Sequence, residues 1–246
     1  MTAATPAPSP THSLADVVKA YDVRGTVPDQ IDTRVTRAIG AAFAEVVVRG
    51  DGATGCVIGH DMRDSSPELS AAFADGARSR GVDVTMIGLA STDGLYYASG
   101  ALDLPGAMFT ASHNPAVYNG IKLSRAGARP VGQDTGLADV RDLAEHILAG
   151  DVTDPGGPSG ALDHRDVLAD YAAFLRGLVD LSGIRPLTVV VDAGNGMGGH
   201  TVPAVLGTGA GLDALPLTVI PLYFELDGTF PNHEANPLDP KNLVDL

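Results

Sequence analysis

The sequence predicts an α/β layer architecture, and three observations support this. Short apolar segments typical of strands alternate with amphipathic segments typical of helices along most of the chain. The segment 187–191 is almost entirely apolar, which is typical of a strand buried on both faces of a parallel sheet. With 44% hydrophobic and 19% charged residues, the 246-residue chain can bury a substantial interior.

The first part of the chain accounts for most of the expected elements. We expect strands at 19–25, 56–59, 82–87, 107–110 and 120–123, and helices at 33–49, 65–80, 91–100 and 134–148. Asp32 is placed to cap the first of these helices, and Gly50 to end it. Ser65 and Glu68 have the spacing of a capping box, with Pro67 in the first turn of the second helix.

The second part is shorter and follows a candidate linker at 150–160, which is rich in Gly, Pro and Asp. We expect a helix at about 165–179, strands at 187–191 and 217–222, and a helix that begins near residue 200. The predicted organisation is a flexible tail at 1–13, a first domain at 14–155 and a second domain at 156–246. A two-stranded element rarely stands alone, so we expect the second domain to be incomplete.

Charge and composition exclude several functional classes. Thirty acidic residues against 16 basic ones give a formal charge of −14, which argues against a nucleic-acid partner. A phosphorylated substrate is still compatible, because a few local bases and backbone N–H groups can bind an anion. No apolar run is long enough to cross a bilayer, and the first 13 residues lack a secretory signal. Cys56 is the single cysteine, which fits a reducing, cytoplasmic setting.

The sharpest local feature is TASHNPAVYNGIKL at 110–123, a strand, a turn and a returning strand. The first strand delivers Ser112 to the turn, with His113 beside it and Lys122 on the return, so that a nucleophilic hydroxyl has a base and a positive charge near it. The alternative is ordinary turn chemistry, since Ser, Asn and Pro all favour turns. On spacing alone the turn interpretation is preferred, because neighbouring side chains on a strand point to opposite faces.

Three further segments stand in a fixed order around this loop: KAYDVRG at 19–25, GHDMRDSS at 59–66, and VVVDAGNGMGG at 189–199 followed by DGTFPNHEANPLDPKNL at 227–243. Together the four segments resemble motifs of the α-D-phosphohexomutases of the phosphomannomutase/phosphoglucomutase type. The similarity extends from about residue 15 to the end. The resemblance implies a mixed-sheet, three-layer αβα domain, followed by a second, incomplete domain of the same type.

The resemblance also implies an activity, the interconversion of hexose 6-phosphate and hexose 1-phosphate of mannose or glucose through a hexose bisphosphate. Ser112 occupies the position of the family's phosphoserine, and its phosphate oxygen would be one ligand of a Mg²⁺ ion. By position, His113 would support the serine and Lys122 would be a general base or charge stabiliser. The resemblance further implies substrate contacts, which would come from Tyr21, Arg24 and Asn114.

Arg24 and Tyr21 also have interpretations without function, a surface ion pair and ordinary strand packing. For Asp61 and Arg63 we prefer a structural role, in which the two pair and brace the loop. The family's Asp-rich metal loop, D-G-D-x-D-R, is absent from the sequence, so we expect little or no mutase turnover by residues 1–246 alone.

Two other hypotheses belong to different classes of protein. The chain could be a non-catalytic remnant or interaction module related to a mutase. Alternatively, Gly194, Gly196 and Gly199 match the G-x-G-x-x-G pattern of dinucleotide-binding domains, although only 47 residues follow, too few to complete such a domain. A tight strand-to-helix connection is the preferred interpretation of these glycines. His233 and Glu234 suggest a metal pair, but a structural loop is preferred because no third ligand stands at a recognised spacing.

Overall fold

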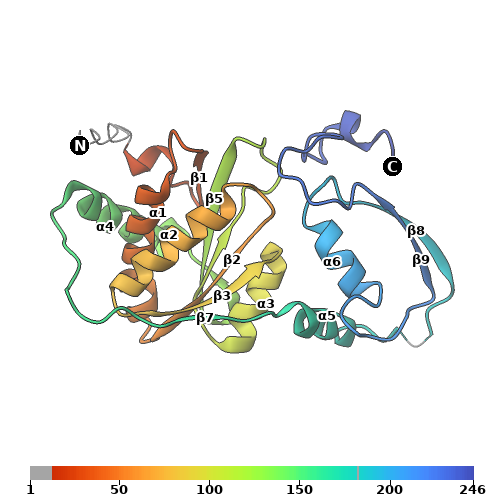
Figure 1. Cartoon of the computed structure of the whole chain (residues 1–246), viewed down its shortest axis with the longest axis horizontal. Helices are drawn as coiled ribbons and strands as arrows, with labels where there is room; N and C mark the ends of the chain where they lie inside the picture. Colours follow the sequence, from red (N-terminus) through yellow and green to blue (C-terminus); the bar gives the residue numbers. More distant parts are fainter. Residues whose placement is uncertain (1–12, 182) are drawn as a thin grey trace, which may run out of the picture.

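The computed structural model describes residues 13–181 and 183–246, so the predicted tail lies outside the described residues except for Ser13. The chain forms two α/β units that lie side by side (Figure 1). The segment between β7 (Leu162–His164) and α5 (Leu168–Gly177) joins them.

The first unit is built on a mixed sheet in the strand order β1-β5-β4-β2-β3-β7, with β6 paired to β5. Strands β4, β2, β3 and β7 run parallel to one another, whereas β5 is antiparallel to β1, β4 and β6. The remaining strands are β1 (Val23–Thr26), β2 (Gly55–His60), β3 (Asp83–Leu89), β4 (Gly106–Phe109), β5 (Tyr118–Arg125) and β6 (Arg129–Pro130).

Helices cover both faces of this sheet, which confirms the predicted three-layer αβα architecture (Figure 1). On one face, Phe43, Phe73 and Phe109 pack in a row with ring centroids 5.5 Å apart at each step. On the other face, Leu95 packs with Met108 in a smaller cluster. The alternation of Met108 and Phe109 along β4 supplies one side chain to each layer. The helices are α1 (Thr33–Phe43), α2 (Ser66–Ser79) and α4 (Leu137–Ala149) on the first face, and α3 (Thr92–Leu102) on the second.

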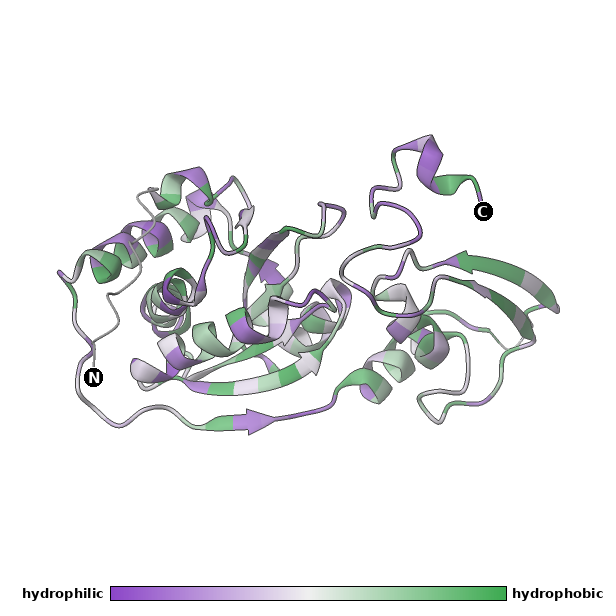
Figure 2. Ribbon diagram, turned by 45° about the horizontal axis from the view of Figure 1, so that its top comes forward, coloured by the Kyte–Doolittle hydropathy of each residue, from purple (hydrophilic) through white to green (hydrophobic). Residues whose placement is uncertain are grey.

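The second unit has a parallel pair of strands, β8 (Leu187–Asp192) and β9 (Leu217–Leu222), with α6 (Gly198–Val205) between them in sequence. Helices α5 and α6 pack together, and a short 3-10 turn, η5 (Pro240–Leu243), follows the last strand. Hydrophobic residues run along both strands (Figure 2), and Val190 and Ile220 are each more than 40% exposed.

Several expected boundaries differ from the structure. The helix expected at 33–49 is α-helical only to Phe43 and continues as a π-helical segment, η2 (Ala44–Arg49). Asp32 caps it as predicted, accepting a hydrogen bond from the Val35 N–H at 2.7 Å. The pairing of β7 with β3 extends the first sheet past the predicted boundary at residue 155.

The capping box predicted at Ser65 and Glu68 is wrong. Ser65 itself has helical backbone angles and makes no capping hydrogen bond with its side chain. Its hydroxyl oxygen instead accepts a hydrogen bond at 2.9 Å from Nδ2 of Asn119 on β5. The oxygen that would accept the capping hydrogen bond is therefore engaged with another strand.

Cys56 lies fully buried on β2, and burial raises the pKa of its thiol to about 12. The thiol is therefore kept protonated and unreactive at neutral pH. Among the described residues, no helix has both the length and the apolar character that a membrane crossing requires.

Candidate active site

Ser112 lies on the loop that leaves β4 and returns as β5, and its side chain is exposed to solvent. The hydroxyl is 3.3 Å from Nδ1 of His113, and the Ser112 N–H donates to Thr110 Oγ1 at 3.1 Å. The Ser112 backbone has φ of +52°, in the left-handed region that costs a residue with a side chain free energy. The surroundings must therefore hold this loop in place.

Arg63 supplies much of that support. Its side chain is buried, and its guanidinium donates four hydrogen bonds to carbonyl oxygens of the serine loop. Nη1 bonds the oxygens of Pro115 at 2.9 Å and Tyr118 at 3.0 Å. Nη2 bonds the oxygens of Ser112 at 3.0 Å and Asn114 at 2.7 Å. The planar fork of one arginine thus fixes the backbone at the reactive position and along the loop that follows it.

Asp61 holds Arg63 in turn, as the sequence interpretation of a loop brace requires. Its Oδ2 lies 3.4 Å from Arg63 Nε, and its Oδ1 accepts from the Arg63 N–H at 3.1 Å and from Ser66 Oγ at 2.6 Å. Burial lowers the pKa of the Arg63 guanidinium, and the neighbouring Asp61 carboxylate opposes that shift. A buried charge needs such a partner, which Asp61 provides.

A second network ties Arg24 and Lys122 to the same loop. Arg24 Nη1 donates to Asn114 Oδ1 at 2.6 Å, and Arg24 Nη2 lies 2.6 Å from Asp22 Oδ2. Lys122 Nζ is 3.3 Å from the same Asp22 oxygen. In the described part of the chain the partner of the Lys122 amine is thus Asp22, and the link to Ser112 runs through Arg24 and Asn114.

Asp22 is the residue that the sequence reasoning missed. A signal was present, because Asp22 stands two positions before Arg24 in KAYDVRG. Residues two apart on an extended segment share a face, so a carboxylate at that position is within reach of the arginine. Tyr21 does not join the network. It is 78% exposed, and its ring lies beside Gly132.

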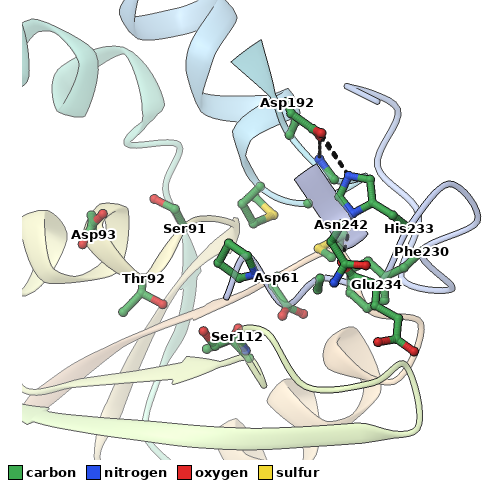
Figure 3. Close-up of a pocket in the computed structure, with 18 of the residues that line it drawn as sticks. Asp61, Ser91, Thr92, Asp93, Ser112, Asp192, Phe230, His233, Glu234 and Asn242 are labelled. Carbon is green, nitrogen blue, oxygen red and sulfur yellow. Dashed lines mark hydrogen bonds and ion pairs between the residues drawn. The ribbon is translucent and has the colours of Figure 1, made fainter. Parts of the chain in front are cut away.

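Ser112 opens into a cleft of about 500 Å³ between the two units. Figure 3 shows Ser112 and Asp61 on one wall and Asp192, His233 and Glu234 on the other. The lining is rich in carboxylates. Even so, the described residues contain no group of three or more His, Cys, Asp or Glu side chains placed to hold a metal ion.

His233 and Glu234 do not form the metal pair considered above. Nε2 of His233 lies 3.0 Å from Asp192 Oδ2, and the ring packs edge-on against Tyr223 at 5.4 Å. The Glu234 carboxylate lies 3.3 Å from the amine of Lys241. A backbone hydrogen bond to the Glu234 carbonyl and the Asp192 carboxylate together raise the pKa of His233. These contacts support the structural interpretation of the loop.

The space beside the glycine-rich turn at 194–199 is filled by the protein's own backbone. A Cβ atom at Gly199 would lie only 2.0 Å from the carbonyl oxygen of Phe224. Glycine is thus required at this position for backbone packing between α6 and the segment after β9. This contact favours the tight-connection interpretation over a dinucleotide site.

Fold and site together define an α/β protein that presents an exposed serine, on an arginine-braced loop between two sheet strands, to a cleft between two units. Family models identify the class further. The model for domain I of phosphoglucomutase/phosphomannomutase, an alpha/beta/alpha domain, matches residues 15–148, and that for domain II matches residues 169–246. The chain belongs to the phosphoglucomutase/phosphomannomutase family.

Individual relatives agree with this assignment. A protein of Xanthomonas campestris named phosphohexose mutases is 40% identical over 225 residues, which is 91% of this chain and 47% of the relative. A phosphomannomutase of Escherichia coli is also 40% identical, over 91% of this chain and 48% of the relative. The chain thus spans about half the length of the curated relatives that it matches.

Solved structures show the same relationship. A phosphoglucomutase/phosphomannomutase family protein from Burkholderia thailandensis superposes with a TM-score of 0.78 at 35% identity, over 93% of this chain and 48% of the other. A putative phosphomannomutase from Thermus thermophilus gives 0.76 at 25% identity, over 92% of this chain and 50% of the other.

Proposed function

We propose that this chain carries the phosphoryl-transfer serine of a hexose-phosphate mutase, which interconverts hexose 6-phosphate and hexose 1-phosphate of mannose or glucose. The observation that carries the proposal is the exposed hydroxyl of Ser112, on a loop whose backbone Arg63 fixes through four carbonyls. A phosphoryl carrier needs an accessible oxygen in a fixed position, since phosphoryl transfer depends mainly on positioning and charge neutralisation.

The reaction has two halves. Phosphoserine 112 first gives its phosphoryl group to a hexose hydroxyl. The phosphorus–Oγ bond breaks, a bond to the sugar oxygen forms, and the proton of the sugar hydroxyl passes to the released Ser112 oxygen, which yields the free serine and the hexose bisphosphate. After the bisphosphate turns over in the site, the bond between its other phosphorus and the sugar oxygen breaks, that phosphoryl group returns to the Ser112 oxygen, and the hexose monophosphate leaves. His113, whose Nδ1 lies 3.3 Å from that oxygen, is placed to receive the serine proton in the return step.

Charge near the serine supports the binding of a phosphate. Arg24 and Lys122 bring two positive charges to the single negative charge of Asp22, which leaves one charge for an incoming phosphate dianion. Arg24 presents a planar fork suited to phosphate oxygens, and Asn114 holds that fork beside the loop. We propose Arg24 and Asn114 as substrate contacts. The position of Tyr21 away from this network gives its proposed contact no support.

The family resemblance implies Mg²⁺, which would neutralise charge on the migrating phosphoryl group through an oxygen of phosphoserine 112. We propose that the described residues alone do not supply its carboxylate ligands. We therefore also propose that residues 1–246 accept a phosphoryl group but give little net turnover, because the sequence lacks D-G-D-x-D-R.

Intact-mass spectrometry tests the role of the serine. After incubation with glucose 1,6-bisphosphate and MgCl₂, the chain should gain the mass of one phosphoryl group. Ser112→Ala should gain none, whereas Ser159→Ala, which removes another exposed serine, should behave like the wild type. An unmodified wild-type chain, or modification that persists in Ser112→Ala, would contradict the proposal and favour the non-catalytic alternative.

A further inference from the structure

The two units of the structure meet on Arg63. The second unit reaches it with the turn at 227–230, which we call the DGTF turn. A Cβ atom at Gly228 would lie 2.8 Å from Arg63 Cα, so the two backbones touch where the turn passes. The Phe230 ring then packs against the guanidinium, with Arg63 Cζ 5.1 Å from the ring centroid. This distance is within the range of a cation–π contact.

The DGTF turn is held firmly by its own unit. Asp227 Oδ1 accepts hydrogen bonds from the Thr229 N–H at 2.8 Å and the Thr229 hydroxyl at 2.6 Å. The Asp227 N–H donates to the Asn195 carbonyl at 3.0 Å, and the buried Asn195 side chain donates to the Glu225 carbonyl at 2.9 Å. The turn therefore moves with the strand ends of the second unit rather than as a free loop.

One guanidinium thus carries two sets of contacts. Its edge donates to the four carbonyls of the Ser112 loop, and its face rests on Phe230 from the other unit. Both Phe230 and Ser112 line the cleft between the units. A displacement of the second unit would remove the ring from the guanidinium, whose hydrogen bonds hold Ser112 at its positive φ.

We propose that Arg63 is a positioning residue that couples the seating of the second unit, through Phe230 and Gly228, to the conformation of the Ser112 loop. The loop is held in its described conformation when the DGTF turn rests on Arg63, and it loosens when the units part. The coupling itself is a property of the unphosphorylated chain, and only its catalytic meaning rests on the proposed function of Ser112.

Hydrogen exchange of the whole chain, read by mass spectrometry on peptides that cover residues 110–123, measures the coupling. Phe230→Leu keeps an apolar side chain but removes the ring. The exchange rate of the loop amides should rise roughly 2- to 30-fold, the factor that corresponds to the free energy of a cation–π contact. Peptides from β2 and α1 should exchange as in the wild type, because their packing does not involve the turn.

The matched control is Phe174→Leu, which makes the same change at another aromatic contact between the units. Phe174 on α5 lies 5.2 Å from Tyr97 on α3, whereas the hydrogen bonds that hold the Ser112 loop come from Arg63. This variant should leave loop exchange at the wild-type rate. An equal rise in both variants, or a rise across the whole first sheet, would mean general loosening and would overturn the proposal.

Two further variants keep the test decisive if Phe230→Leu folds poorly. Gly228→Ala places a methyl group against the Arg63 backbone and should raise loop exchange in the same way. Arg63→Lys keeps the charge but loses the fork, and loop exchange should then no longer respond to Phe230→Leu. If the effects of Arg63→Lys and Phe230→Leu on loop exchange are additive, the proposal is overturned.

The outcome is separable from that of the proposed function. Loop exchange is read without substrate, whereas phosphoryl uptake by Ser112 is read by intact mass. Normal coupling without uptake would contradict the proposed function alone, and normal uptake without coupling would contradict this inference alone.

Discussion

At the scale of single residues, the pair formed by His233 and Asp192 closes the far wall of the cleft. Asp192 ends β8, and His233 lies on the loop that returns toward the first unit, so the pair fastens that loop to the sheet. The His233 side chain is 17% exposed and that of Asp192 7%, which limits screening by solvent. The protonated imidazole donates to both the Glu234 carbonyl and the carboxylate, which is why the pKa of His233 is raised.

We expect this pair to make stability depend on pH. A raised pKa in the folded state means that the extra stability is fully present below about pH 6.5, the ordinary value for histidine. It is then lost as pH rises through the higher pKa of the folded state. Urea unfolding of the wild type at pH 5.5 and 8.5 should show this loss, and His233→Gln and Asp192→Asn should reduce it. An unchanged pH dependence in both variants would show that the pair contributes nothing.

The sequence predicted some of these residue-level features and not others. The exposure of Ser112 at a strand end follows from the turn residues Asn114 and Pro115, because turns of this composition lie at the surface. The four carbonyls bonded by Arg63 could not be predicted, because they depend on how the segment between β2 and α2 and the Ser112 loop approach each other in space. Local patterns carry information about the turn but none about a partner 49 residues away.

At the scale of elements, the glycine-rich turn between β8 and α6 is a packing device. The absence of a side chain at Gly199 lets the helix approach the chain after β9 to within contact of the Phe224 carbonyl. In a dinucleotide-binding domain, a turn with the same G-x-G-x-x-G pattern would be open to a pyrophosphate. The structure therefore distinguishes two interpretations that share one sequence pattern.

We expect Gly199→Ala to destabilise the second unit by at least about 1–3 kcal/mol, because a methyl group cannot occupy the space beside the Phe224 carbonyl without moving the backbone. Gly177→Ala is the matched control, since nothing lies within 4 Å of a Cβ atom at that position in α5. It should be neutral or slightly stabilising. Denaturant unfolding measures both. Equal effects would contradict the packing role, and a rise in melting temperature with NAD would revive the nucleotide interpretation.

Most of the first unit's elements could be predicted because each has its own hydrophobic periodicity and its own capping residues. Asp32, for example, caps α1. The errors come where a distant contact decides. Ser65 has the spacing of a cap, yet Asn119 takes its hydroxyl. The three-residue strand β7 has too few residues to show an alternation, and only its pairing with β3 makes it a strand.

At the scale of the whole molecule, the chain brings an exposed serine and a carboxylate-lined cleft together. The described residues hold no cluster of three metal-ligating side chains, and the matched relatives are about twice as long. Phosphoryl uptake and net turnover place different demands on these groups. Uptake needs one donor, one accessible oxygen and local charge, whereas turnover also needs the bisphosphate to reverse in the site.

We therefore expect residues 1–246 to separate the two activities. With glucose 1,6-bisphosphate the chain should take up a phosphoryl group on Ser112. With glucose 1-phosphate, Mg²⁺ and the bisphosphate as activator, a coupled assay should detect little glucose 6-phosphate above the level of the Ser112→Ala variant. Substantial turnover lost in Ser112→Ala would contradict this expectation, because it would mean that the cleft between the two units already contains every group that the cycle requires.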